Sequence, residues 1–147
     1  MSGTRHIVCG HCRRTNRLPV ERASKEARCG ACHQPIFTGH PVEVDEEGFG
    51  RHVANNDIPV LVDIWAPWCG PCRAMAPMFE RAAVELEPKV RVLKLNADQA
   101  PAVSSRLNIT GIPTLLLMRG GREIARQAGA MDARGIVAWV EAGLARS

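Results

Sequence analysis

The hydrophobic pattern is regular from Pro41 onward, where apolar runs alternate with amphipathic stretches. Residues 59–66 form a nearly continuous apolar run, which is typical of a central parallel strand covered on both faces. Residues 70–86 place apolar side chains at helical spacing on one face, so they predict a helix that contains Pro77. This part of the chain therefore begins as a strand followed by a helix.

The other segments continue the alternation. We expect short strands at 41–44 and 90–96 and helices at 46–55 and 99–107. Residues 114–118 and 123–127 flank a Gly-Gly turn and predict a hairpin. Asp132 is the expected N-cap of a closing helix over 132–145. The order β-α-β-α-β-α-β-β-α predicts an α/β fold, a mixed central sheet with helices on both faces.

Charge divides the chain near residue 40. Residues 1–41 hold seven Lys or Arg and two Asp or Glu, a formal charge of +5, whereas residues 42–147 have a formal charge of −1. We therefore expect a module over residues 1–40 and a domain over 41–147. A basic module can attract nucleic acid, but a solvated basic face is the favoured interpretation, and we expect no nucleic-acid partner.

The remaining composition is typical of a globular protein, with 46% apolar and 23% charged residues. The first ten residues have no apolar core of a secretory signal, and no run approaches the length of a membrane span. We therefore expect a cytoplasmic protein without membrane contact. In that compartment, six cysteines favour metal ligands and a catalytic pair over structural disulfides.

Four cysteines lie in the first module as two C-x-x-C pairs that are separated by sixteen residues: Cys9, Cys12, Cys29 and Cys32. This spacing is typical of a zinc site, because two tight turns then face each other around a tetrahedral ion. A segment of this size has little apolar core, and zinc binding supplies roughly 10–16 kcal/mol toward its folding. The pattern predicts one structural zinc ion.

Three other interpretations apply to these cysteines. Cys9 and Cys12 resemble an oxidoreductase dithiol but follow no buried strand. The run from Cys29 to His33 matches a c-type haem attachment motif, which leaves the first pair unexplained. His11 or His33 can replace one sulfur ligand, but four cysteines at standard spacing are favoured. We expect no organic cofactor.

The third pair, Cys69 and Cys72, opens the predicted helix directly after the apolar strand. Free N–H groups and the helix dipole stabilise a thiolate at this position, so the pKa of Cys69 should fall. We expect Cys69 to be the exposed attacking sulfur and Cys72, one turn further, to resolve the mixed disulfide. The alternative is a structural disulfide.

Asp63 lies in the middle of the predicted buried strand, where a carboxylate is costly unless it is paired or useful. Burial should raise its pKa, which makes Asp63 a candidate acceptor for the Cys72 proton. Lys94, on a neighbouring predicted strand, is the expected charge partner. The alternative is that both are structural polar residues at one end of the sheet.

Residues 41–147 resemble the thioredoxin family. The likeness lies in Val62–Cys72, in Gly111-Ile112-Pro113-Thr114, in Lys94 and in Gly129. With its four-cysteine zinc module, the whole chain resembles the bacterial thioredoxin-2 subfamily. The resemblance implies a thioredoxin fold with a small zinc-ribbon-like module.

The resemblance also implies a substrate site. It implies a cis bond between Ile112 and Pro113, although the residues alone favour a trans bond. An extended substrate segment would form hydrogen bonds with the Ile112 backbone. It would also contact a surface formed by Trp68, Gly70 and Pro71. Trp65 is expected to pack beneath the site.

The predicted function is a protein-disulfide reductase. Gly70 and Pro71 offer no positive side chain to the Cys69 thiolate, unlike the histidine-containing loops of oxidising relatives. The implied partners are disulfide-containing proteins as substrates and thioredoxin reductase as electron donor, and we expect a monomer. Two alternatives stay open: a redox-regulated zinc-containing interaction module or chaperone, and an exported oxidant.

Overall fold

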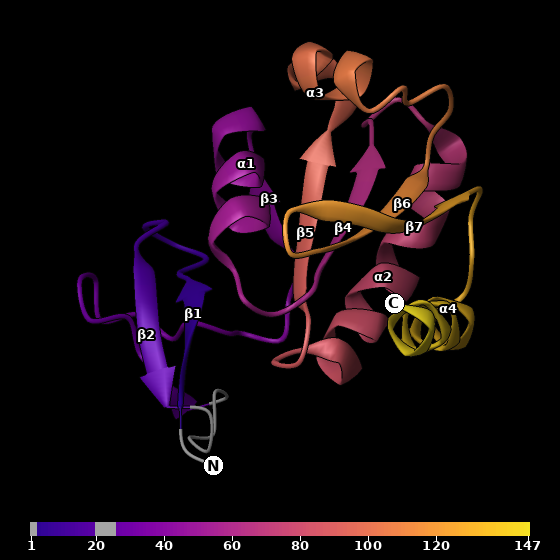
Figure 1. Cartoon of the computed structure of the whole chain (residues 1–147). Helices are drawn as coiled ribbons and strands as arrows, with labels where there is room; N and C mark the ends of the chain where they lie inside the picture. Colours follow the sequence, from indigo (N-terminus) through magenta and orange to yellow (C-terminus); the bar gives the residue numbers. More distant parts are fainter. Residues whose placement is uncertain (1–2, 20–25) are drawn as a thin grey trace.

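A computed structural model describes residues 3–19 and 26–147 of the chain (Figure 1). Near the N-terminus, β1 (Thr4–Val8) pairs antiparallel with β2 (Thr15–Pro19). The main sheet has the strand order β3-β5-β4-β6-β7. Its strands are β3 (Val42–Val44), β4 (Val60–Trp65), β5 (Arg91–Asn96), β6 (Thr114–Arg119) and β7 (Arg122–Ala128).

The main sheet is mixed, as the order of elements predicts. Strands β3, β5 and β4 are parallel, whereas β6 runs antiparallel to β4 and β7 antiparallel to β6. Strand β4 is therefore central but has a parallel neighbour on one side only. Its continuous apolar run reflects burial on both faces, and that burial is the same for either direction of the neighbouring strand.

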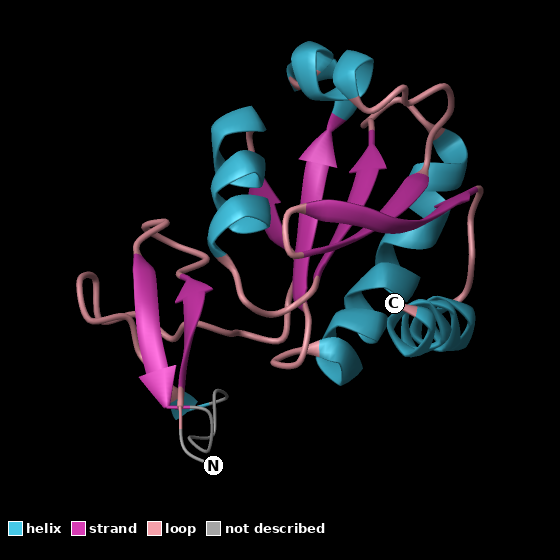
Figure 2. Cartoon of the chain, in the orientation of Figure 1, coloured by secondary structure: helices cyan, strands magenta, loops and turns pink. Residues whose placement is uncertain are grey.

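Helices cover both faces of this sheet (Figure 2). Helices α2 (Gly70–Leu86) and α4 (Ala133–Arg146) pack on one face with Leu61 and Val92, and α1 (Glu46–Asn55) and α3 (Pro101–Arg106) lie on the other with Val62 and Leu93. Side chains alternate between the faces along a strand. Asp63 therefore shares the α2 face of β4 with Leu61.

Local sequence signals determine where several elements begin. Asp132 caps α4 as predicted, because its Oδ1 accepts the Gly135 N–H at 2.7 Å. Helix α2 begins at Gly70 and runs through Pro77 to Leu86. The β6–β7 turn places Gly120 and Gly121 at φ values of 59° and 80°, a left-handed pair that glycine adopts at little cost.

The β1–β2 hairpin lies beside α1, near the ends where β4 and β5 begin (Figure 1). The Asp57 N–H donates to the His6 carbonyl at 2.8 Å, and the Val8 N–H donates to Asn56 Oδ1 at 2.8 Å. Ile58, which precedes β4, belongs to the small core around Ile7 and Ile36. The cysteine-rich part is therefore attached to the sheet at the beginning of β4, whereas Cys69 follows the end of that strand.

Candidate functional site

Cys69 is the N-cap of α2, and its Sγ accepts the Cys72 N–H at 3.2 Å. The two sulfurs form a disulfide, so the structure holds the oxidised pair. Cys69 is 5% exposed and Cys72 is 2% exposed. The expectation of an exposed Cys69 is therefore wrong for this state, because its sulfur is bonded to Cys72 and packs with Ala66 and Ile112.

A groove of about 600 Å³ lies next to Cys69. Its lining comes from Trp68, Gly70 and Pro71 of the redox motif, and from Ala97, Ser104 and residues 109–112 later in the chain. The Ile112 carbonyl lies 3.8 Å from Cys69 Sγ, and the bond between Ile112 and Pro113 is cis. The structure thus brings Trp68, Gly70, Pro71 and Ile112 together in one groove beside Cys69, whereas Pro113 does not line it.

Trp68 extends from this site into solvent. It is 68% exposed, and its Nε1 donates to both carboxylate oxygens of Asp98 at 3.0 and 3.2 Å. The hydrogen bond holds an exposed apolar ring at the edge of the groove. Asp98 was not singled out from the sequence, because it meets Trp68 only in the folded chain.

Asp63 is 1% exposed, and burial raises its pKa to about 7 while the positive charge of Lys94 opposes the rise. Asp63 and Lys94 are register partners on β4 and β5. The Lys94 ammonium lies 4.2 Å from the centroid of the Trp65 ring, a cation–π distance. Lys94 therefore acts on Asp63 through space, without a close ion pair, which is a looser pairing than the sequence suggested.

The surroundings of the Asp63 carboxylate allow it to accept a proton. Within the described part of the chain, its Oδ1 is buried without a hydrogen-bond partner. A carboxyl group with a pKa near neutrality exchanges its proton readily at physiological pH. Asp63 lies on the face of β4 that α2 covers, and α2 carries Cys72 in its first turn.

The four cysteines of the first module form a second cluster, whose sulfurs all lie within 4.8 Å of one another. Cys9 Sγ is 3.7 Å from Cys32 Sγ, and Cys12 Sγ is 3.6 Å from Cys29 Sγ. A tetrahedral zinc ion with bonds of about 2.3 Å requires sulfur–sulfur distances of about 3.8 Å. The cluster therefore fits zinc in both ligand type and spacing.

Backbone N–H groups stabilise thiolates in this cluster. Cys9 Sγ accepts the His11 N–H at 3.3 Å, and Cys29 Sγ accepts the Ala31 N–H at 3.4 Å. Burial opposes ionisation of Cys29, but hydrogen bonds from Cys32, Asn16 and Ala31 outweigh it and lower its pKa to about 6. Burial raises the pKa of the Cys9 thiol. The glycine-containing turns thus supply donors to sulfur, as expected of zinc ligands.

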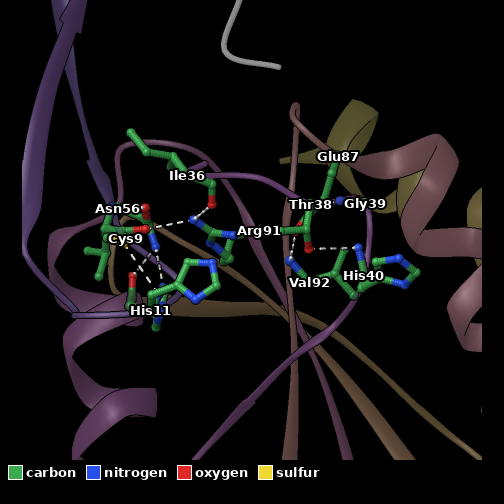
Figure 3. A network of polar contacts seen from close by, with 12 residues as sticks. Cys9, His11, Ile36, Thr38, Gly39, His40, Asn56, Glu87, Arg91 and Val92 are labelled. Atoms are coloured by element: carbon green, nitrogen blue, oxygen red, sulfur yellow. Dashed lines mark hydrogen bonds and ion pairs between the residues drawn. The ribbon is translucent and has the colours of Figure 1, made fainter. Parts of the chain in front are cut away.

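A buried arginine, Arg91, which pairs with Glu87, joins the zinc module to the main sheet (Figure 3). Arg91 and Glu87 have side chains that are 0% and 2% exposed, and their Nη1 and Oε2 atoms are 3.5 Å apart. Arg91 Nη2 also donates to the carbonyls of Val8 at 2.6 Å and Ile36 at 3.0 Å. The sequence did not identify this contact, because Arg91 stands in an alternating strand pattern where a charge normally faces solvent.

The geometry is that of a thiol–disulfide exchange protein. A mixed sheet carries a disulfide-forming cysteine pair at a helix N-terminus, and a separate cluster holds four thiols. Comparison with known families agrees. Residues 40–142 match the thioredoxin family, and residues 8–34 match the zinc ribbon described as thioredoxin 2, N-terminal. The chain belongs to the thioredoxin family.

Individual relatives extend this likeness. Thioredoxin C-3 of Corynebacterium nephridii is 39% identical over 135 residues, which are 92% of each chain. Thioredoxin 1 of Nostoc sp. is 44% identical over 60% of this chain and 83% of its own. The crystal structure of chloroplastic thioredoxin z has a TM-score of 0.65 and 30% identity, covering 72% of this chain and 96% of that one.

The protein is therefore a thiol-disulfide oxidoreductase with an N-terminal zinc-binding module, as the sequence predicts. In the part of the chain that the structure describes, no helix is long and apolar enough to cross a bilayer.

Proposed function

We propose that Cys69 attacks disulfides of other proteins and that Cys72 completes the reaction. The Cys69 thiolate attacks one substrate sulfur, the substrate disulfide breaks, and the departing thiolate takes up a proton. Cys72 then loses its proton and attacks Cys69 Sγ, which forms the Cys69–Cys72 disulfide and releases the second substrate thiolate. Two electrons pass from this protein to the substrate, the Cys72 proton is taken up within the protein, and the two released substrate thiolates are protonated from solvent.

The N-cap position of Cys69 is the observation that carries this assignment. Its Sγ already accepts the Cys72 N–H, and the positive end of the α2 dipole favours a thiolate there. Cys69 also lines the groove, whereas Cys72 lies one turn further along α2 with 2% exposure. The attacking role therefore goes to Cys69 and the resolving role to Cys72.

Asp63 serves as acceptor for the Cys72 proton, directly or through a water molecule. Support comes from its burial, its unpartnered Oδ1 and its pKa near 7. Lys94 serves as a positioning residue, because its positive charge limits the rise in the pKa of Asp63. Neither residue contacts the substrate in this account.

The substrate is an extended segment of a disulfide-containing protein that lies in the groove. Trp68, Gly70 and Pro71 contact it on one side. Ile112, whose carbonyl lies 3.8 Å from Cys69 Sγ, offers it backbone hydrogen bonds. Main-chain recognition of this kind accepts many sequences, which suits a general reductase.

The finer assignments complete the proposal. One structural zinc ion is bound by the four N-terminal cysteines, which stay reduced because the protein works in the cytoplasm. The chain acts as a monomer and receives electrons from an NADPH-dependent thioredoxin reductase. Residues 1–40 form the zinc module and residues 41–147 the redox domain.

A coupled assay tests this function. NADPH oxidation is followed with a thioredoxin reductase and insulin as the disulfide substrate, and Cys69→Ser is the control. Turnover by the wild-type chain and none by Cys69→Ser is the expected result, with a redox potential near −270 mV, the value known for thioredoxin. A potential near −120 mV, typical of disulfide-forming oxidants, would contradict the reducing direction.

A further inference from the structure

The far side of the groove begins at the C-terminus of α3. The Asn108 N–H donates to the Ser105 carbonyl at 3.1 Å, and the Ile109 N–H donates to the Ser104 carbonyl at 2.8 Å. Asn108 has a φ of 55°, in the left-handed region. This pattern is the Schellman motif that ends many helices, with asparagine in the position that usually holds glycine.

These two bonds use the carbonyls of Ser104 and Ser105, and they leave the carbonyls of Leu107 and Asn108, just beyond α3, free to accept other donors. Arg126 of β7 supplies the partner: Nη2 donates to the Leu107 carbonyl at 2.6 Å, and Nη1 donates to the Asn108 carbonyl at 3.2 Å. A cation is also favourable at the negative end of a helix dipole. Arg126 therefore closes the end of α3 from a different strand.

Glu123 fixes the direction of the Arg126 guanidinium. Arg126 Nε and Nη2 each donate to a Glu123 carboxylate oxygen at 2.8 Å, a bidentate pair. The two side chains are 33% and 30% exposed, so the pair is partly protected from solvent. A planar fork held in this way loses less side-chain entropy per hydrogen bond than a free arginine.

The segment that Arg126 holds continues directly into the groove. Residues 109–112 line it, and its other end is fixed where Thr114 Oγ1 donates to the Gly111 carbonyl at 2.6 Å. Ile112 at that end lies next to Cys69. The groove wall is thus tied at Asn108 by Arg126 and at Gly111 by Thr114.

We propose that the Arg126–Glu123 pair is a positioning device that shapes the groove wall at residues 109–112 for protein substrates. The inference rests on the proposed function, because it takes the groove to be where substrate binds. A small disulfide reaches Cys69 without spanning this wall, whereas a protein segment must fit along it. Arg126 therefore affects the reaction with protein disulfides and leaves the reaction with small disulfides unchanged.

The test compares two substrates with the same pre-reduced protein. Rate constants are measured for insulin and for hydroxyethyl disulfide, using the wild type, Arg126→Met, Arg126→Lys and Glu123→Gln. Arg122→Met is the matched control, since Arg122 is an exposed arginine on the same strand. Amide hydrogen exchange over residues 107–112 reports the wall itself.

We expect Arg126→Met to lower the insulin rate constant about tenfold, because two charge-assisted hydrogen bonds are lost, with no change for hydroxyethyl disulfide. Arg126→Lys should recover only part of the rate, because an ammonium cannot reproduce the fork. Exchange at 107–112 should increase in Arg126→Met and not in Arg122→Met.

Equal insulin rates for Arg126→Met and wild type, or an equal loss with both substrates, would overturn the positioning role while leaving the proposed function intact. Wild-type protein that reduces neither disulfide would overturn the proposed function and this inference together.

Discussion

Arg91 Nη2 donates a 2.6 Å hydrogen bond to the carbonyl of Val8, the residue directly before the zinc-site cysteine Cys9. The same guanidinium lies 4.3 Å from the Phe37 ring centroid and faces Glu87 at the end of α2 (Figure 3). The side chain of Arg91, the first residue of β5, thus links the zinc module to the C-cap of α2. Replacing it tests how firmly the two parts are joined.

Arg91→Met should lower the free energy of unfolding by about 3–5 kcal/mol, because it leaves the buried Glu87 carboxylate without its cation. The carbonyls of Val8 and Ile36 also lose their donor. Denaturant unfolding of the zinc-loaded protein measures the effect. Lys89→Met, an exposed change in the preceding loop, is the control and should alter stability by less than about 0.5 kcal/mol.

Glu87→Gln separates the charge effect from the lost hydrogen bonds. In the Arg91→Met background it removes the unpaired charge, so the double variant should be more stable than Arg91→Met alone. Full recovery is not expected, since the two backbone carbonyls remain unpaired. A double variant whose losses simply add would show that the ion pair contributes no coupling.

Asp63 should make the protein less stable as the pH rises from about 4 to 7. Its folded pKa is raised to about 7, so in this range the folded protein holds a proton that the unfolded chain has lost. The loss is complete above the folded pKa. Asp63→Asn should remove it and be more stable than wild type by up to about 4 kcal/mol at pH 8, with little difference at pH 4.

Unfolding curves between pH 4 and pH 8 measure this effect, with the exposed change Glu141→Gln as a control that keeps the wild-type slope. The resolution step gives a second readout, since Asp63→Asn should slow the attack of Cys72 at neutral pH. An unchanged pH slope in Asp63→Asn would mean that Asp63 is not the titrating group.

Zinc removal should weaken the N-terminal module and leave the redox chemistry largely intact. The module contacts the first residue of β5 and Ile58 just before β4, whereas Cys69 follows the far end of β4, a strand that spans about 17 Å at the usual rise per residue. Metal analysis should give one zinc per chain, and the chelated protein should reduce insulin within about twofold of the loaded protein if zinc is purely structural.

Graded peroxide distinguishes this account from a redox-regulated module. Zinc retained at doses that oxidise Cys69 and Cys72 supports a structural site. Zinc released at lower doses, with loss of order in residues 1–40, would favour a switch based on the zinc thiolates.

Local signals made much of this structure predictable. The bounds of α2 follow from the N-cap position of Cys69 and from helical spacing, and Asp132 marks the start of α4. The close cluster of the four N-terminal cysteines follows from their spacing and from a glycine in each turn. Each of these features is encoded within a few neighbouring residues, which is why pattern reading finds them.

Long-range contacts were not predictable in the same way. Arg91 donates a hydrogen bond to Val8 across 83 residues of sequence. Arg126, on β7, donates one to the carbonyl of Leu107 at the end of α3. An arginine in a strand pattern carries no mark of its partner, so neither contact could be predicted from that pattern. The burial of Cys69 was missed because the expectation described the reduced attacking thiol, whereas in the structure its sulfur is bonded to Cys72 and packs with Ala66 and Ile112.

The most direct test of the central claim is to trap the mixed disulfide. Pre-reduced Cys72→Ser is mixed with insulin, and the adduct is digested and located by mass spectrometry. The account predicts a stable disulfide between the substrate and Cys69, and no adduct with Cys69→Ser. An adduct on Cys72 in the Cys69→Ser protein, or on any zinc-site cysteine in place of Cys69, would contradict it.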